Sequence, residues 1–411
     1  MHFRSKHFRF RPDPIPRVGG VSGRAVNLAL LGRFTDELFS GLPQVLMPSI
    51  RARLGFGYPQ IGLLWLALSY VAAVVEPVSA LLIDVWRRHR LLAWGAAGSG
   101  LALVVIGVAP NYLLLLVGFA LYGATSGPLA HTADIVLVEA HPEAPARIYA
   151  RSTLLDTLGA LLGPLIVTGG IWADLDWRWI LVGVGLWGPV YAALILRTEF
   201  PRPAGAHEPG ASLVATFRRN LGSAFANRTA MLWLLLLFGQ DVLDAPLPLR
   251  SVWLVDDAGM SQALVGVYVA VELGASLVAI AYLDRWLQHA SPRSILVTAV
   301  IALFVLYPAW FWVPGVWAKF AIGLPLGFFG GVLWPVAQAE LLSSLPGRAG
   351  ALTALRSTLN FVPLTLLVGF LAEWQGLGVS MVSVHVAGLA VMAVVLARLP
   401  GGLPSHAPIE E

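Results

Sequence analysis

The chain has 411 residues, of which 57% are hydrophobic, 12% are charged and none is cysteine. A soluble domain carries roughly 25% charged residues, so a soluble protein of this composition could not cover its surface with polar groups. The lack of cysteine excludes disulfide and thiol chemistry. The formal net charge of +4 does not indicate a nucleic-acid partner, because the charges lie in short segments between apolar runs.

The first 24 residues form a basic segment ahead of the first apolar run. That run lacks a short apolar core ending in a small-residue cleavage site, so we interpret it as a retained span. Twelve apolar windows follow in chain order, at 25–50, 59–83, 90–109, 112–138, 149–172, 178–197, 229–254, 262–283, 294–313, 316–344, 352–373 and 378–398. They are longer than barrel strands of about 9–11 residues. Helices are therefore predicted, because they satisfy their own backbone in lipid.

The basic residues are distributed unevenly between the two sides of the predicted membrane. With the N-terminus inside, 21 of the 27 lysines and arginines fall in cytoplasmic segments. The five on the predicted outer side are Arg51, Arg53, Arg178, Arg250 and Lys319. This asymmetry predicts a multi-pass plasma (inner) membrane protein with both termini in the cytoplasm.

Tryptophans flank two of the predicted outer loops. Their positions are Trp172, Trp177 and Trp179 for one loop, and Trp310, Trp312 and Trp317 for the other. Such positions are typical of the aromatic belts at a membrane interface.

The two halves of the chain are related by an offset of 205 residues. Arg151-Ser152-Thr153-Leu154 recurs as Arg356-Ser357-Thr358-Leu359, and the same offset takes Asp36 to Asp241 and Pro43 to Pro248. Six spans per half give both copies the same orientation, as in parallel-repeat transporters. The predicted organisation is a basic tail at 1–24, a six-helix half at 25–197, a cytoplasmic linker at 198–228, a second half at 229–398 and a tail at 399–411.

Ionisable residues lie within many of the predicted spans, where each costs roughly 2.5–3.5 kcal/mol on insertion scales. Such residues usually face a cavity or a partner. The candidates for proton coupling or substrate binding are Arg33, Asp36, Glu37, Glu76, His131, Asp134, Asp156, Asp241, Asp244, Glu272 and Glu340.

Spacing along the helices suggests which of these residues act together. Arg33 shares a face with Asp36 and Glu37, which predicts that one acid pairs with Arg33 while the other takes up protons. Asp241 and Asp244 also share a face. His131 and Asp134 are three residues apart and could relay protons. Fixed salt bridges, helix–helix hydrogen bonds and snorkelling to an interface remain the structural alternatives.

Two motifs resemble those of the major facilitator superfamily. The loop after the second span reads Ala80-x3-Asp84, with Arg88 following, and a fainter copy stands in the second half. The fifth span contains Gly159-x3-Gly163-Pro164, which is similar to part of an antiporter signature. The resemblance implies gating roles for Asp84, Arg87, Arg88, Asp284, Arg285, Gly159, Gly163 and Pro164.

The first helices are most similar to the fosmidomycin-resistance type of exporter within that superfamily. The residues are Phe34-Thr35-Asp36, Leu42-Pro43 and Gln60-Ile61-Gly62. The resemblance implies twelve transmembrane helices in two six-helix pseudo-symmetric halves. It also implies a proton-coupled transporter that exports a small amphipathic molecule by alternating access, and not an enzyme.

Two other functions remain open at this point. A proton symporter that imports a metabolite would use the same acids, and a membrane assembly factor or sensor would not transport at all. The expected partners are the lipid bilayer, protons and a small-molecule substrate, with no nucleic acid. No phosphate-binding loop, metal-ligand spacing or nucleophile motif occurs, so no cofactor, metal or catalytic residue is predicted.

Overall fold

The computed structural model describes residues 22–85, 87–140, 145–200, 225, 227–344, 356 and 362–399. Across these residues the chain is built from α-helices. Most of the predicted N-terminal tail, linker and C-terminal tail falls outside the described residues, as do Ser357, Thr358 and Leu359 of the repeated tetrapeptide.

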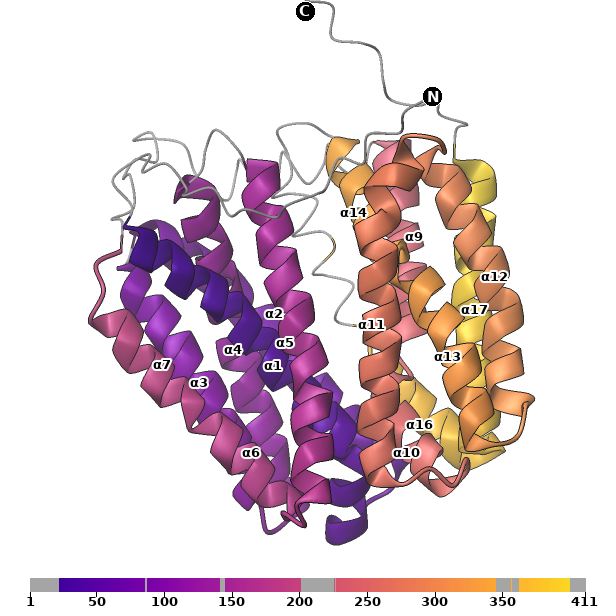
Figure 1. Ribbon diagram of the computed structural model, residues 1–411, viewed down its shortest axis with the longest axis horizontal. Helices are drawn as coiled ribbons and strands as arrows, with labels where there is room; N and C mark the ends of the chain where they lie inside the picture. The colour runs from indigo at the N-terminus through magenta and orange to yellow at the C-terminus, as the bar shows by residue number, and fades with distance from the viewer. Residues whose placement is uncertain are drawn as a thin grey trace, which may run out of the picture.

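The helices of the first half form one bundle and those of the second half form another beside it (Figure 1). The first half comprises α1 (Gly23–Leu54), α2 (Tyr58–Val85), α3 (Arg88–Val108), α4 (Tyr112–Ala140), α5 (Pro145–Trp172), α6 (Trp177–Gly185) and α7 (Trp187–Leu196). The second comprises α9 (Arg228–Asp244), α10 (Leu247–Asp256), α11 (Gln262–Leu287), α12 (Pro292–Trp312), α13 (Val316–Gly331), α14 (Leu333–Ser343), α16 (Leu364–Gln375) and α17 (Leu377–Arg398).

The fifteen helices in the described part of the chain correspond to the twelve predicted windows, because three of the windows are each split into two helices. Ten segments are long and apolar enough to cross a membrane, and α16 is a shorter apolar helix. α1 is 32 residues long and carries the polar positions of the first span. The predicted all-α membrane fold with two six-helix halves is confirmed.

The splits within three spans were not expected from the apolar windows. α9 gives way to α10 at Ala245 and Pro246, where proline removes a backbone donor. α6 meets α7 at Leu186, three residues before Pro189, which likewise has no backbone donor. Missing donors thus accompany the splits in these two spans, which remain apolar throughout.

Short polar side chains fix where several helices begin. Ser22 accepts a hydrogen bond from the Ala25 amide and begins α1, and Asn227 accepts one from the Ala230 amide and begins α9. Such caps satisfy amides that the first turn of a helix leaves without partners. Gly55 adopts a φ of 67° directly after α1, a backbone conformation that favours glycine, so the chain can turn there into α2.

The predicted tryptophan belts are only partly correct. Trp172, Trp179, Trp312 and Trp317 are all more than half exposed, as expected of residues that meet an interface. Trp177 and Trp310 are instead buried in the hydrophobic core. Trp310 packs between Trp253 and other rings of the second half, so helix packing, not the membrane interface, determines its position.

The two halves contact each other through equivalent helices. α2 packs against α16, and α5 packs against α11, so each interface joins the second span of one half to the fifth of the other. α1 also contacts α10. This reciprocity is the arrangement expected of a two-fold pseudo-symmetric pair of halves.

Side chains that join the halves gather at the end of the bundle where α1 finishes, which we name the Arg51 end. Arg51 Nη1 lies 2.5 Å from Asp256 Oδ2. Gln262 Nε2 donates to the Val45 oxygen over 2.5 Å, and Thr168 donates to the Ala263 oxygen over 3.0 Å. The opposite end, where α1 begins, is named the Gly23 end. In Figure 1 the ribbons of the two bundles diverge towards it.

The predicted glycine motif of the fifth span contacts two different helices. A Cβ on Gly159 would lie 2.3 Å from the Phe34 backbone oxygen, and one on Gly163 would lie 3.3 Å from the Leu38 oxygen, so both glycines face α1. The Pro164 oxygen instead lies against Gly266 of α11, across the interface between halves. Small residues therefore allow α5 to approach both neighbours closely.

Gly159→Ala is expected to destabilise the protein by about 1–3 kcal/mol, the usual cost of overpacking, because the new methyl group meets the backbone of α1. Thermal unfolding of the purified protein in detergent measures this change. Gly169→Ala is the matched control, since the same helix has open space at that position. Equal melting temperatures for the two variants would contradict the close contact between α1 and α5.

Candidate functional site

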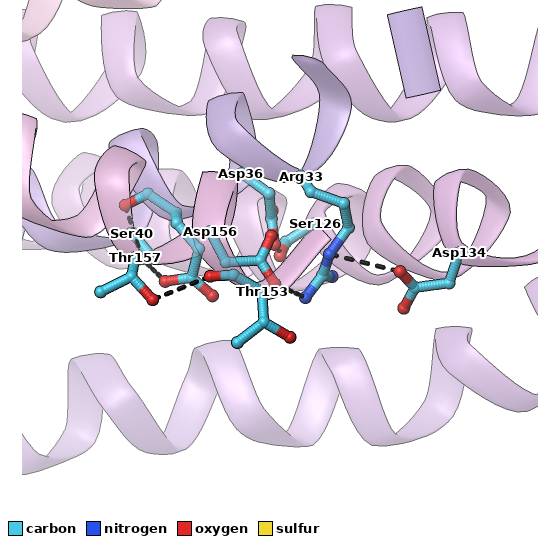
Figure 2. A network of polar contacts seen from close by, with 9 residues as sticks. Arg33, Asp36, Ser40, Ser126, Asp134, Thr153, Asp156 and Thr157 are labelled. Carbon is cyan, nitrogen blue, oxygen red and sulfur yellow. Dashed lines mark hydrogen bonds and ion pairs between the residues drawn. The ribbon is translucent and has the colours of Figure 1, made fainter. Parts of the chain in front are cut away.

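Arg33 lies at the centre of a polar network that joins three helices of the first half. Its Nη2 atom is 2.7 Å from Asp156 Oδ2 on α5, and its Nε atom is 3.4 Å from Asp134 Oδ1 on α4. Figure 2 shows the guanidinium between these two carboxyl groups. The predicted pairing of Arg33 with an acid of its own helix was wrong, because α1 packs against α4 and α5 and their acids reach the guanidinium instead.

Asp36 is buried and receives its hydrogen bond from a neutral group. Ser126 of α4 donates to Asp36 Oδ1 over 2.7 Å, and the Asp36 side chain makes no ion pair within the described part of the chain. Tyr122 donates to the Asp36 backbone oxygen over 3.1 Å, which fixes α1 against α4. Thr35 beside it accepts from Trp187 Nε1 over 3.1 Å.

Glu37 completes a group that we name the N-half cluster, defined as Arg33, Asp36, Glu37, Asp134 and Asp156. Ser40 donates to Glu37 Oε2 over 3.3 Å. The cluster thus holds four carboxyl groups around one arginine. Burial disfavours the charged form of a carboxyl unless a cation or several donors compensate it. Asp134 and Asp156 have such a cation in Arg33, whereas Asp36 and Glu37 receive hydrogen bonds from serine hydroxyls.

His131 and Glu76 form a second contact nearby. His131 Nε2 of α4 lies 3.9 Å from Glu76 Oε1 of α2, a charge contact that is too long for a hydrogen bond. His131 therefore has Glu76 as its ion-pair neighbour, and the proton relay between His131 and Asp134 stays a prediction. Gly127 brings the two helices together, since a Cβ there would be 2.8 Å from Glu76 Cγ.

The second half contains an ion pair that the sequence did not reveal. Arg250 donates from both terminal nitrogens to Glu272, over 2.8 Å and 2.7 Å, and both side chains are largely buried. Arg250, which the charge count assigned to the outer side, lies on α10 and is buried inside the protein. Lys319, also assigned to the outer side, is buried and donates to backbone oxygens of Trp310, Phe311 and Val313.

Asp241 and Asp244 lie at the end of α9 with different surroundings. Asp241 Oδ1 is 3.6 Å from Arg356 Nη2, and Arg356 also donates to Gln338 over 3.0 Å. Asp244 is exposed and makes no ion pair with any described residue.

For the remaining candidates the structure gives mainly their burial, or does not describe their side chains. Glu340 is half-buried near the end of α14. Arg87 is exposed, Arg88 is buried, and the guanidinium of Arg285 is exposed and lies 5.5 Å from the Tyr282 ring centre. The side chains of Asp84 and Asp284 lie outside the described residues, so the gating roles implied by the loop motif stay predictions.

Arg51 and Asp256 form a contact that sequence reasoning overlooked. The two residues are 205 positions apart, which is the offset of the repeat, so each is the counterpart of the other. Arg51 also donates from Nε to the Phe56 oxygen over 3.2 Å and lies 4.6 Å from the Tyr58 ring centre. The repeat offset itself was the available signal, because opposite charges at equivalent positions can meet on a two-fold axis.

Comparison with known proteins agrees with this architecture. Residues 29–368 match the family described as the Major Facilitator Superfamily. The chain belongs to the major facilitator superfamily. As a member it is a multi-pass membrane transporter of small molecules and not an enzyme. The resemblance of its first helices to the fosmidomycin-resistance type remains a resemblance.

Solved structures and curated sequences extend the comparison. A bacterial homolog of the human lysosomal transporter Spinster, in an inward-facing and unoccupied conformation, has a TM-score of 0.67 at 16% identity, covering 91% of this chain and 94% of that one. The nucleoside transporter NupG has a TM-score of 0.71 at 11% identity, covering 91% and 98%. Identities this low show that the fold is shared.

Two curated relatives have names that refer to resistance. The fatty acid resistance protein FarB of Neisseria gonorrhoeae is 28% identical over 166 residues, which are 40% of this chain and 32% of that protein. The multidrug resistance protein B homolog of Mycobacterium tuberculosis is 31% identical over 152 residues, 36% of this chain and 28% of that protein. The matched region thus spans about a third of the length of these relatives.

Glu272→Gln is expected to destabilise this superfamily member by about 3–5 kcal/mol, because it leaves the buried Arg250 charge without its partner. Replacing both residues, as in Arg250→Met with Glu272→Leu, is expected to recover most of that loss. Melting temperatures in detergent test both variants. Glu373→Gln is the exposed control and is expected to stay within about 0.5 kcal/mol of the unmodified protein. A double variant as unstable as the single one would refute the pairing argument.

Proposed function

We propose that the protein is a proton-coupled exporter of a small amphipathic molecule, working by alternating access between its two halves. The observation that supports proton coupling most directly is the N-half cluster, in which Arg33 pairs with Asp134 and Asp156 while Asp36 and Glu37 have no ion-pair partner among the described residues. The names of the two resistance-type relatives support export. Proton entry at the cluster would then provide the energy for substrate exit.

The proposed coupling step is proton exchange at Asp36. Its hydrogen-bond donor is the Ser126 hydroxyl, which can equally accept a hydrogen bond from a protonated carboxyl. Asp36 can thus gain or lose a proton while the contact persists. Arg33 is held by Asp134 and Asp156 at the same time, so its charge disfavours simultaneous protonation of every acid in the cluster.

The proposed direction of access follows from charge and contact together. The excess of basic residues in the predicted cytoplasmic segments supports a cytoplasmic position for the Gly23 end and an inner-membrane location. The side-chain contacts described between the halves lie at the Arg51 end, which would then be the outer side. Rocking of the halves would break these contacts and open the protein outward.

Asp36→Asn is expected to abolish substrate flux driven by a pH gradient in proteoliposomes while leaving the protein folded, because asparagine retains the contact with Ser126 but cannot exchange a proton. Flux of the substrate against an imposed gradient, measured in both orientations of that gradient, is the readout. Outward movement coupled to inward protons supports export, and movement of both in one direction would show symport instead.

Asp174→Asn is the matched control for that experiment. Asp174 is exposed in the connection between α5 and α6 at a φ of 56°, which asparagine tolerates. Its flux is expected to equal that of the unmodified protein. Full gradient-dependent flux in Asp36→Asn would remove Asp36 from the coupling step.

Removing either charge of the Arg51–Asp256 pair is expected to weaken closure of the Arg51 end. The natural chain has no cysteine, so Gly57→Cys with Glu373→Cys adds one reactive pair where α2 and α16 meet. The rate of cross-linking of this pair is expected to fall about 2–5-fold in Arg51→Gln or Asp256→Asn, the effect of losing one partly exposed ion pair.

The double variant Arg51→Gln with Asp256→Asn is expected to cross-link no more slowly than either single variant, because both substitutions remove the same contact. Additive losses would show that the two residues act separately. Unchanged cross-linking in both single variants would show that the pair contributes nothing to closure.

A further inference from the structure

Arg356 lies between an acid, an amide and an aromatic ring of the second half. Its Nη2 atom is 3.6 Å from Asp241 Oδ1 on α9, and its Nη1 atom donates to Gln338 Oε1 on α14 over 3.0 Å. Its guanidinium carbon is 5.9 Å from the centre of the Trp334 ring, also on α14. The three contacts hold one cation against two helices.

This group of residues lies well inside the membrane-spanning part of the protein. Asn227, at the start of α9, donates to the Ser344 oxygen over 3.3 Å, so this contact joins the start of α9 to the end of α14. Trp334 stands ten residues before Ser344, which is about 15 Å along a helix. That distance is about half the thickness of a bilayer core.

The ion pair faces water at this depth. Asp241 keeps 29% of its side-chain surface accessible, and Arg356 keeps 24%. Charged side chains within a membrane face the interior of the bundle or a water-filled opening, because contact with lipid is costly. The accessible side of this pair therefore lines an opening that a dissolved molecule can enter.

Arg356 is less fully engaged than Arg33 and Arg250. Arg33 lies between two carboxyl groups, and Arg250 donates two hydrogen bonds to one. Within the described part of the chain, Arg356 donates one hydrogen bond, to Gln338, and its ion pair with Asp241 is too long for another. A guanidinium has five N–H donors, so most of those on Arg356 remain for a ligand.

Gln338 and Trp334 add to what Arg356 can bind. The Gln338 oxygen accepts from Arg356, which leaves the two hydrogens of its amide nitrogen as further donors beside the guanidinium. Trp334 precedes Gln338 by four residues, so the two side chains share a face of α14. The Trp334 side is apolar and 38% exposed. N–H donors beside an accessible ring suit an oxyanion that is attached to an apolar body.

The charges of the group favour a ligand with a single negative charge. Arg356 carries one positive charge, which Asp241 offsets from 3.6 Å away. A carboxylate that replaces Asp241 at the guanidinium balances this charge one to one, and its two oxygens match the planar fork of arginine. A phosphate dianion would leave one negative charge without a partner.

We propose that Arg356 and Gln338 bind the carboxylate of an amphipathic molecule, with Trp334 beside its apolar body and Asp241 competing for Arg356. The proposal names the substrate class of the transporter and so rests on the proposed function. Arg356 then has two states. It pairs with Asp241 when the site is empty and with the ligand when the site is filled.

Binding of three matched probes to the purified full-length protein, in an uncharged detergent, tests the site without any transport. The probes 4-phenylbutyrate, 4-phenylbutanol and 4-phenylbutylamine share one apolar body and differ in the charge of the end group. Isothermal titration calorimetry measures each dissociation constant. The unmodified protein is expected to bind the carboxylate at least about 10-fold more tightly than the alcohol, as for a hydrogen bond to a charged group.

The variants are expected to change carboxylate binding in opposite directions. Arg356→Gln is expected to weaken it at least about 10-fold, and Gln338→Met about 2–10-fold through the loss of one neutral donor. Asp241→Asn is expected to strengthen it about 2–5-fold, because the competing acid is removed. Arg398→Gln and Gln288→Met, both at exposed positions, are the matched controls and are expected to bind as the unmodified protein does.

Three results would overturn the site. Carboxylate binding that is absent, or no tighter than that of the alcohol, would show that Arg356 does not recognise the charge. Tighter binding of the amine, lost in Asp241→Asn, would make the ligand a cation held by Asp241. Equal losses of carboxylate binding in Asp241→Asn and Arg356→Gln would show that the pair only supports the fold.

Two further comparisons keep the test independent of folding and of transport. Gln338→Met changes no charge, so its comparison with Gln288→Met stands even if Arg356→Gln does not fold. Equal binding in these two glutamine variants would remove Gln338 from the site. Proton coupling is judged separately, by the flux of Asp36→Asn, which alters no residue of the carboxylate site.

Discussion

Arg33 places a permanent positive charge inside a membrane-spanning helix, and the packing of the first half depends on pairing it. A buried charge is tolerated only when partners compensate the loss of water. Asp134 and Asp156 supply those partners from α4 and α5. α5 can approach α1 this closely because Gly159 presents no side chain to the Phe34 oxygen. The pairing of Arg33 with Asp156 therefore depends on the close packing of α5 against α1.

The contact between Arg51 and Asp256 shows where the pseudo-symmetry axis passes. Two positions related by the repeat offset can touch only if both lie near the axis that relates the halves. The reciprocal packing of α2 with α16 and of α5 with α11 is consistent with the same axis. The ion pair at this place joins the halves at the end where Gln262 and Thr168 also bond across the interface.

The sequence predicted those features that depend on local pattern. The lengths of the apolar runs predicted the spans, and the 205-residue offset between Asp36 and Asp241 predicted their division into two related halves. The partners of Arg33 could not be predicted, because i,i+3 spacing describes one helix and says nothing of the acids on its neighbours. The partner of Arg250 could not be predicted for the same reason, because Glu272 lies on a different helix, α11.

The two halves have the same arrangement of helices, but their buried charged residues occupy different positions in it. Positions equivalent to Arg33 and Asp156 are Phe238 and Phe361, and those equivalent to Arg250 and Glu272 are Val45 and Ala67. Each half thus has its own buried ion pair where the other has apolar side chains. Asp36 and Asp241 are equivalent, yet one receives a hydroxyl and the other faces an arginine. The interfaces between the halves are therefore symmetric, whereas the surroundings of the ionisable residues inside each half are not.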